Sequence, residues 1–134
     1  MLVWIYGGGF VTGNSKYSEY GPDRWIDQDI VVVTLNYRAG ALGFFSLGVP
    51  AVSGNQGLLD QNMALTFVKN NIAEFGGNPG DITLMGQSAG SSSALYHLMS
   101  PRSEGLFHKV IAQSGSNFSP SLHSVTGDQV KIWS

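Results

Sequence analysis

The stretch that decides the fold is "MGQSAGSSSALYHLM", residues 85 to 99. An apolar run over residues 82–85 predicts a β-strand, and residues 88–99 predict a helix that ends before Pro101. Between them, residues 86–90 match G-x-S-x-G, the pattern of a nucleophile elbow when it joins a strand to a helix. Eighteen glycines make the pentapeptide alone a weak signal, so its place between strand and helix carries the prediction. We expect a turn too tight for a side chain at either flanking glycine, with the hydroxyl of Ser88 lifted above the sheet.

A second glycine-rich stretch, "YGGGFVTG" at residues 6–13, follows an apolar run over residues 1–5. Glycine destabilises a helix or strand by roughly 0.5–1 kcal/mol relative to alanine, so three glycines in a row indicate a specific structural or functional role. Attack by Ser88 on an ester carbonyl would create an oxyanion that needs backbone N–H donors. Gly8 and Gly9 are the predicted donors together with Ala89, the residue after the serine. The alternative is that the glycines form only a flexible turn.

The order of elements predicts an α/β fold with a largely parallel sheet. Apolar runs at residues 2–6, 30–37, 82–85 and 109–113 alternate with longer connections. One connection, residues 57–75, has apolar residues near helical spacing: Leu58, Leu59, Met63, Leu65, Val68 and Ile72. If the first strand lies between the second and the third, Gly9 and Ser88 meet at the carboxyl edge of the sheet, where ligands bind in such folds.

Composition narrows the range of functions. The 134 residues are 43% hydrophobic and 12% charged, which fits one domain or a large piece of one. A net charge of -2 without a basic cluster argues against nucleic-acid binding, and no apolar run approaches the length of about 20 residues that spans a bilayer. There is no cysteine and no metal-ligand spacing, so we expect no metal and no cofactor. The expected partner is a small-molecule ester; the oligomeric state is left open.

Five segments, "VWIYGGGF", "LNYRAGALGFF", "GNQGLLDQNMAL", "FGGNPGDITLMGQSAGSSS" and "GLFHKVIAQSGS", occur in an order and spacing that resemble the type-B carboxylesterases. This family is the cholinesterase-like branch of the α/β-hydrolases. The resemblance covers residues 2–119 and implies carboxylic esters as substrates, Ser88 as nucleophile, and Gly8, Gly9 and Ala89 as the oxyanion hole. It also suggests a secreted or extracellular protein and a buried ion pair between Arg38 and Asp60. From the residues alone, these two side chains could equally be solvated charges.

Two residues beside the predicted site bear on the substrate. Cholinesterases usually have glutamate before the nucleophile. Here the residue is Gln87, and the resulting sequence "GQSAG" resembles insect juvenile-hormone esterases and some other insect esterases. A neutral amide removes a negative charge, so we expect an uncharged ester in place of a cationic choline ester; a change without effect on the substrate is the alternative. Phe10, after the glycines, either lines the acyl side of the pocket or packs in the core.

The base and the acid of a triad are missing from the predicted site. In this fold they follow the serine in the order acid, then histidine, and the resemblance places both beyond residue 134. His97 lies about 13 Å along the helix axis from Ser88, so a packing role is expected. His108 precedes the fourth strand, at the opposite edge of the sheet, and His123 lies in a polar tail. We therefore expect the 134-residue chain alone to be inactive.

The expected domain organisation is a fragment, residues 1–134, of one α/β-hydrolase domain, with a tail that diverges from the family pattern from about residue 122. An alternative function is a non-catalytic, cholinesterase-like adhesion or interaction module. A third hypothesis, a hormone-sensitive-lipase-type esterase, is weakened because that group usually has histidine where this chain has Tyr6.

Overall fold

The computed structural model describes residues 1–118, and these build a four-stranded parallel sheet. The strand order is β2-β1-β3-β4, so the first strand lies between the second and the third, as the sequence predicts. The strands are β1 (Leu2–Ile5), β2 (Val32–Thr34), β3 (Thr83–Gln87) and β4 (Lys109–Gln113). Because all four are parallel, their carboxyl ends meet at one edge.

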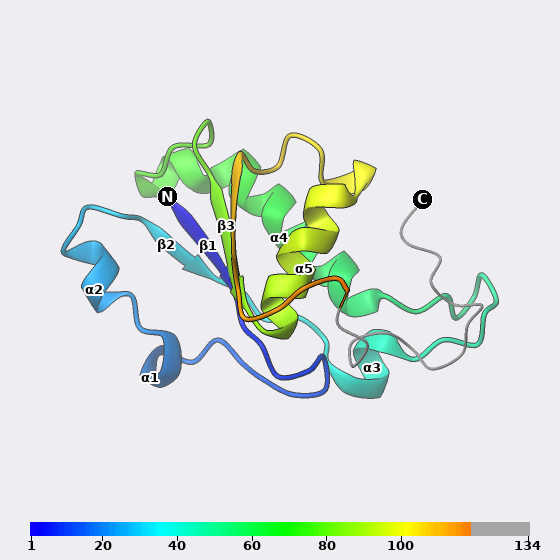
Figure 1. Cartoon of the computed structure of the whole chain (residues 1–134). Coiled ribbons are helices and arrows are strands. Elements are labelled where there is room, and N and C mark those ends of the chain that lie inside the picture. The colour runs from blue at the N-terminus through cyan, green and yellow to red at the C-terminus, as the bar shows by residue number, and fades with distance from the viewer. Residues whose placement is uncertain (119–134) are drawn as a thin grey trace.

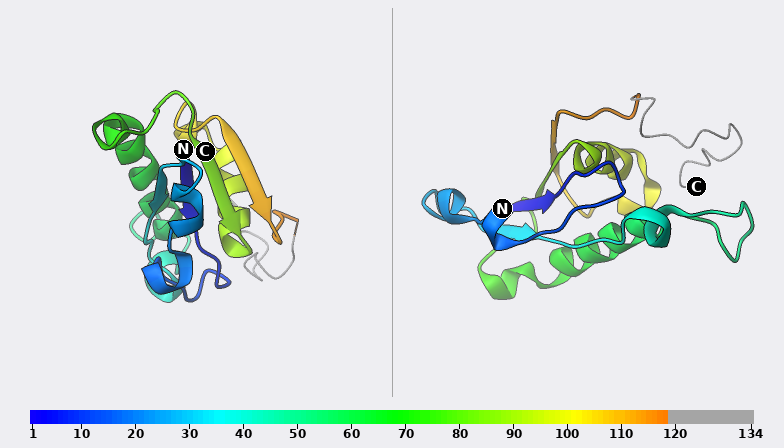
Figure 2. Two further views of the ribbon diagram at one scale, coloured as in Figure 1. Left: turned by 90° about the vertical axis from the view of Figure 1, so that its left-hand side faces the viewer. Right: turned by 90° about the horizontal axis from the view of Figure 1, so that it is seen from below.

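Two long helices cover one face of this sheet (Figure 1). They are α4 (Gln56–Asn71), continued by the 3-10 turn η1 (Ile72–Phe75), and α5 (Ala89–Met99), followed by η2 (Pro101–Ser103). Both helices lie within about a residue of their predicted bounds. Shorter helices are α1 (Tyr17–Tyr20), α2 (Asp23–Ile26) and α3 (Gly40–Phe44). In the views of Figures 1 and 2, α1 and α2 lie on the side of the sheet away from α4 and α5.

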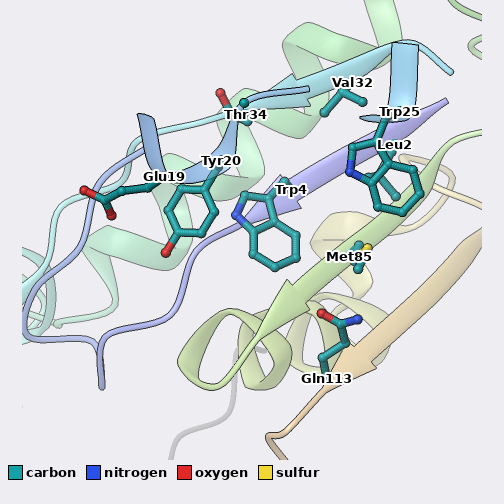
Figure 3. A pocket seen from close by; sticks show the side chains of 10 residues that line it. Leu2, Trp4, Glu19, Tyr20, Trp25, Val32, Thr34, Met85 and Gln113 are labelled. Atoms are coloured by element: carbon teal, nitrogen blue, oxygen red, sulfur yellow. The ribbon is translucent and has the colours of Figure 1, made fainter. Parts of the chain in front are cut away.

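The core lies between the sheet and the two long helices. Alternate strand residues point to opposite faces. On the helical side, Val3, Ile5 and Leu84 of the strands are buried in one cluster with Leu65 and Val68 of α4 and Ala94 of α5. On the other face, Leu2, Trp4, Val32, Thr34, Met85 and Gln113 line a cleft of about 230 Å³ beneath α1 and α2 (Figure 3).

Two expectations about this architecture are wrong in detail. The strand predicted over residues 30–37 is shorter, because from Leu35 onward the chain leaves the sheet and Tyr37 bonds to Tyr6 instead. Met63 is 72% exposed, because α4 turns its face with Leu58, Leu65 and Val68 inward.

The ion pair between Arg38 and Asp60 forms, but it is not buried. Arg38 donates from its backbone N–H at 3.0 Å and from its guanidinium at 2.8 Å to both oxygens of Asp60 on α4. The Arg38 side chain is 51% exposed and that of Asp60 is 24% exposed. These bonds from Arg38 lower the pKa of Asp60, and they tie the segment after β2 to α4.

Candidate active site

The candidate site centres on the sharp bend between β3 and α5. Ser88 stands at this bend with φ 56° and ψ −121°, a region that L-residues with a Cβ seldom adopt. Its backbone N–H donates to the carbonyl of Gln113 on β4 at 2.8 Å, which fixes the bend to the neighbouring strand. Ser88 as a residue is partly exposed, so the bend lies at the surface of the core and not inside it.

Both glycines that flank the bend are required by close backbone approaches. A Cβ on Gly86 would overlap with the carbonyl of Gly90, and a Cβ on Gly90 would overlap with the carbonyl of Ile5. Alanine at either position would therefore push α5 away from β1 and β3. The expectation of a turn too tight for these side chains is confirmed.

The glycine-rich turn after β1 lies against this bend. Ile5 pairs with Gly86 across the sheet, so β1 and β3 end side by side. A Cβ on Gly7 would lie 2.7 Å from the carbonyl oxygen of Gln87 and 3.0 Å from the Cβ of Ser88. The two glycine-rich motifs, 79 positions apart in the sequence, thus meet at the carboxyl edge of the sheet.

Backbone N–H groups are open in both turns. Gly8 and Gly9 adopt φ values of 113° and 62°, and within residues 1–118 neither amide donates to a carbonyl or side chain. The carbonyl of Gly8, in contrast, accepts bonds from Val11 and Thr12, which holds the turn in shape. Ala89 is the first residue of α5, where helical N–H groups have no partner within the helix and the helix dipole favours negative charge.

The two predicted substrate-binding residues lie in different surroundings. Gln87 is exposed, and its side-chain oxygen would be 2.8 Å from a Cβ on Gly7, so it borders the glycine turn directly. Phe10 is partly buried and its ring packs on Phe44 with centroids 5.0 Å apart. Two roles were considered for Phe10, lining the pocket and packing in the core. Its contact with Phe44 supports packing in the core.

His97 is fully enclosed in a polar network away from Ser88. Its Nε2 lies 3.0 Å from Oε1 of Gln61, and its Nδ1 lies 2.8 Å from Oγ of Ser103. Because Gln61 uses its amide to donate to Ser93, its oxygen accepts, which places the proton of His97 on Nε2. Burial lowers the pKa of His97 to about 4, so the ring is neutral at physiological pH.

The sequence interpretation did not include this network, although a signal for it exists. Gln61 lies between Leu58 and Leu65 on the apolar face of α4, and Ser93 lies one helical turn before His97. Asn62 completes the network by donating to Ser103 at 3.0 Å. A glutamine on the apolar face of a helix needs a buried polar partner, which the serines and the histidine supply.

Ser91, Ser92 and His108 have structural partners. Ser91 and Ser92 are fully buried and donate to the carbonyls of Gly115 and Ser116, which holds the loop after β4 against α5. His108 accepts a bond from the amide of Ile82 at the opposite edge of the sheet, as predicted. His123 and the tail from about residue 122 lie outside the described residues.

Other kinds of site find no support in the described part of the chain. Residues 1–118 contain no cluster of three or more metal-ligating His, Cys, Asp or Glu side chains. Their helices include none whose length and hydropathy would cross a bilayer. The cleft of Figure 3 is lined by Trp4, Tyr20, Trp25 and other residues of the face away from α4 and α5, and neither Ser88 nor Gly8 borders it.

Comparison with known proteins agrees with this geometry. The model of the carboxylesterase family matches residues 1–131. The chain is 48% identical over 122 residues to Cholinesterase 2 of Branchiostoma lanceolatum, and the matched region covers 90% of this chain and 36% of that protein. It is 50% identical over 124 residues to Esterase B1 of Culex pipiens, covering 89% of this chain and 22% of that protein.

A solved structure shows the same fold. Juvenile hormone esterase from Manduca sexta, crystallised with OTFP covalently attached, superposes with a TM-score of 0.85 at 42% identity, over 87% of this chain and 22% of that one. The four strands and their helices are therefore part of an α/β-hydrolase arrangement. The chain spans about a third or less of the length of these relatives. On the match of its sequence and its fold, the chain belongs to the carboxylesterase family.

Proposed function

We propose that Ser88 is the nucleophile of a serine carboxylesterase and that residues 1–134 form the nucleophile-bearing segment of one α/β-hydrolase domain. The observation that carries the proposal is the strained backbone of Ser88 at a strand-to-helix bend, packed against the turn of Gly7. A conformation of this kind costs roughly 1–3 kcal/mol and persists where the surrounding structure imposes it, commonly at functional sites.

The reaction follows from the groups around this bend. Oγ of Ser88 attacks the ester carbonyl carbon while its proton passes to a histidine base, and the carbonyl electrons move to the oxygen. The N–H groups of Gly8, Gly9 and Ala89 stabilise that oxyanion. Collapse releases the alcohol with the proton from the histidine, and water then hydrolyses the acyl group from Ser88.

We infer that the histidine and its acid belong to a longer protein. Within residues 1–118, His97 is bonded to Gln61 and Ser103, and His108 is bonded to the amide of Ile82, so both rings already have partners away from Ser88. The relatives, which are several times longer than this chain, are consistent with a base from another segment.

The proposed substrate is a small, uncharged carboxylic ester. Gln87 beside the glycine turn brings no negative charge to the site, so nothing at this position attracts a cationic alcohol group. The relatives include both cholinesterases and other esterases, and the neutral side chain favours the second kind for this chain.

The proposal is tested by labelling with diisopropyl fluorophosphate, which phosphorylates an activated serine. We expect the label on Ser88 in a longer form of the protein that hydrolyses p-nitrophenyl butyrate, and none in the isolated 134-residue chain. The Ser88→Ala variant should lose label and hydrolysis, whereas Ser114→Ala, at an exposed serine after β4, should keep both. Equal labelling of the two lengths would contradict the need for an outside base. Label elsewhere in an active protein would contradict the role of Ser88.

A further inference from the structure

Tyr6 and Tyr37 form a reciprocal pair of hydrogen bonds directly before the glycine turn. The hydroxyl of Tyr6 donates to the carbonyl of Tyr37 at 3.0 Å, and the hydroxyl of Tyr37 donates to the carbonyl of Tyr6 at 3.0 Å. The two rings are stacked with centroids 4.4 Å apart, and both residues are buried. The carbonyl that precedes Gly7 is thus held by a side chain that lies 31 positions later in the sequence.

The same segment also holds the chain that returns from the glycine turn. The N–H of Gly40 donates to the carbonyl of Phe10 at 2.7 Å, and the N–H of Ser15 donates to the side-chain oxygen of Asn36 at 3.0 Å. A Cβ on Gly13 would overlap with the ring of Tyr6, so the returning chain passes directly over that ring. Both ends of the glycine turn are therefore fixed to residues 36–40.

Residues 36–40 are themselves fixed to the rest of the fold. Arg38 is bonded through its backbone and its guanidinium to Asp60 on α4, and α4 packs on the sheet through Leu65 and Val68. The tyrosine pair therefore connects the glycine turn to a segment that is bonded to α4, which packs in the core. The turn itself is built from residues with little conformational preference of their own.

We propose that Tyr37 is a positioning residue for the oxyanion hole: its hydroxyl, bonded to the carbonyl of Tyr6, sets where the N–H groups of Gly8 and Gly9 lie relative to Ser88. This inference rests on the proposed function of those amides. Donors to an oxyanion act only within a narrow range of distance, and a misplacement of about 1 Å can cost about 100-fold in rate. Because the oxyanion exists in the transition state and not in the bound ester, the loss falls on kcat.

The test is Tyr37→Phe in the length of the protein that hydrolyses p-nitrophenyl butyrate. We expect kcat to fall at least about 10-fold with KM within about twofold. A trifluoromethyl ketone adds to the serine and places its oxygen in the hole, so its inhibition constant should rise by the same factor as kcat falls. A residue that only stabilised the fold would not change these two quantities in parallel. Tyr20→Phe is the matched control, because it removes a hydroxyl from a partly buried ring that packs on Trp4 and, within residues 1–118, makes no hydrogen bond to the glycine turn.

The outcomes separate this inference from the proposed function. If Tyr37→Phe matches Tyr20→Phe in kcat and inhibitor affinity, or changes only KM, the positioning role is overturned. If Tyr37→Phe does not fold, Tyr6→Phe, which removes the other hydroxyl of the pair, is judged by the same criterion. Hydrolysis that survives Ser88→Ala overturns the proposed function and this inference with it. Hydrolysis lost in Ser88→Ala but unchanged in Tyr37→Phe overturns this inference alone.

Discussion

Ser88 combines a φ of 56° with a Cβ, and at the residue scale this is where stability and function conflict. The strain of such a conformation is relieved by glycine, which has no Cβ, whereas alanine keeps it. We expect Ser88→Gly to raise the free energy of unfolding by about 1 kcal/mol, since relief of strain exceeds the added chain entropy. Ser88→Ala should leave the free energy of unfolding within about 0.5 kcal/mol of the parent. Urea unfolding of the three proteins measures this, and an equal effect of both variants would mean that the bend stores no strain.

The glycine that follows the bend gives a second prediction at this scale. A Cβ on Gly90 would overlap with the backbone carbonyl of Ile5, which cannot move without shifting β1. We expect Gly90→Ala to lower the free energy of unfolding by about 3 kcal/mol or more. In the matched variant Gly80→Ala, the Cβ would meet the side chain of Asn78, with its oxygen at 3.1 Å, and no backbone atom within 4 Å. Similar losses in the two variants would refute the close approach of α5 to β1.

At the scale of elements, α4 and α5 are joined by the polar network around His97. A buried ring with a pKa of about 4 in the folded state and 6.5 in the unfolded state takes up its proton on unfolding between these values. The contribution to stability is therefore complete above pH 6.5 and is lost as the pH falls to 4, by roughly 3 kcal/mol in all. Below pH 4 both states are protonated and this contribution stays lost.

The check is urea unfolding of the protein between pH 4 and 7, compared with the His97→Gln variant. The parent should lose stability on acidification more steeply than the variant, because carboxylates titrate in both proteins but the imidazole only in the parent. Parallel profiles would show that His97 is not held neutral. His108→Gln is the matched control, because this exposed histidine lies at the start of β4 and outside the network.

At the scale of the whole molecule, the sheet of residues 1–118 has two edge strands, β2 and β4, and each of them pairs with another strand on one side only. On β4, Ile111 is 43% exposed. Strand edges with apolar side chains pair readily with other chains. We expect the isolated 134-residue chain to self-associate with increasing concentration, and Ile111→Lys to reduce this in sedimentation velocity. Leu42→Lys is the control, because Leu42 is 80% exposed on α3, away from a strand edge. A larger effect at Leu42 would disprove the role of the edge.

Local patterns in the sequence predicted much of this structure. The runs of apolar residues and the glycine punctuation determined β1, β3, β4, α4 and α5, because strand and helix periodicity are written in neighbouring residues. They also identified Ser88 with its flanking glycines, since a tight bend can be recognised from residues that lack side chains. The strand over residues 30–37 and the inward place of Met63 were wrong, because the end of a strand and the phase of a helix depend on what packs against them.

The sequence by itself thus determined the parallel α/β class, the family and the bend that carries Ser88. Only the tertiary structure decided that Gly7 touches Ser88, that Tyr37 holds the carbonyl of Tyr6, and that His97 is locked between Gln61 and Ser103. These contacts join residues from 6 to 81 positions apart. Their geometry is fixed by strand order and helix docking, so no pattern along the chain could specify it.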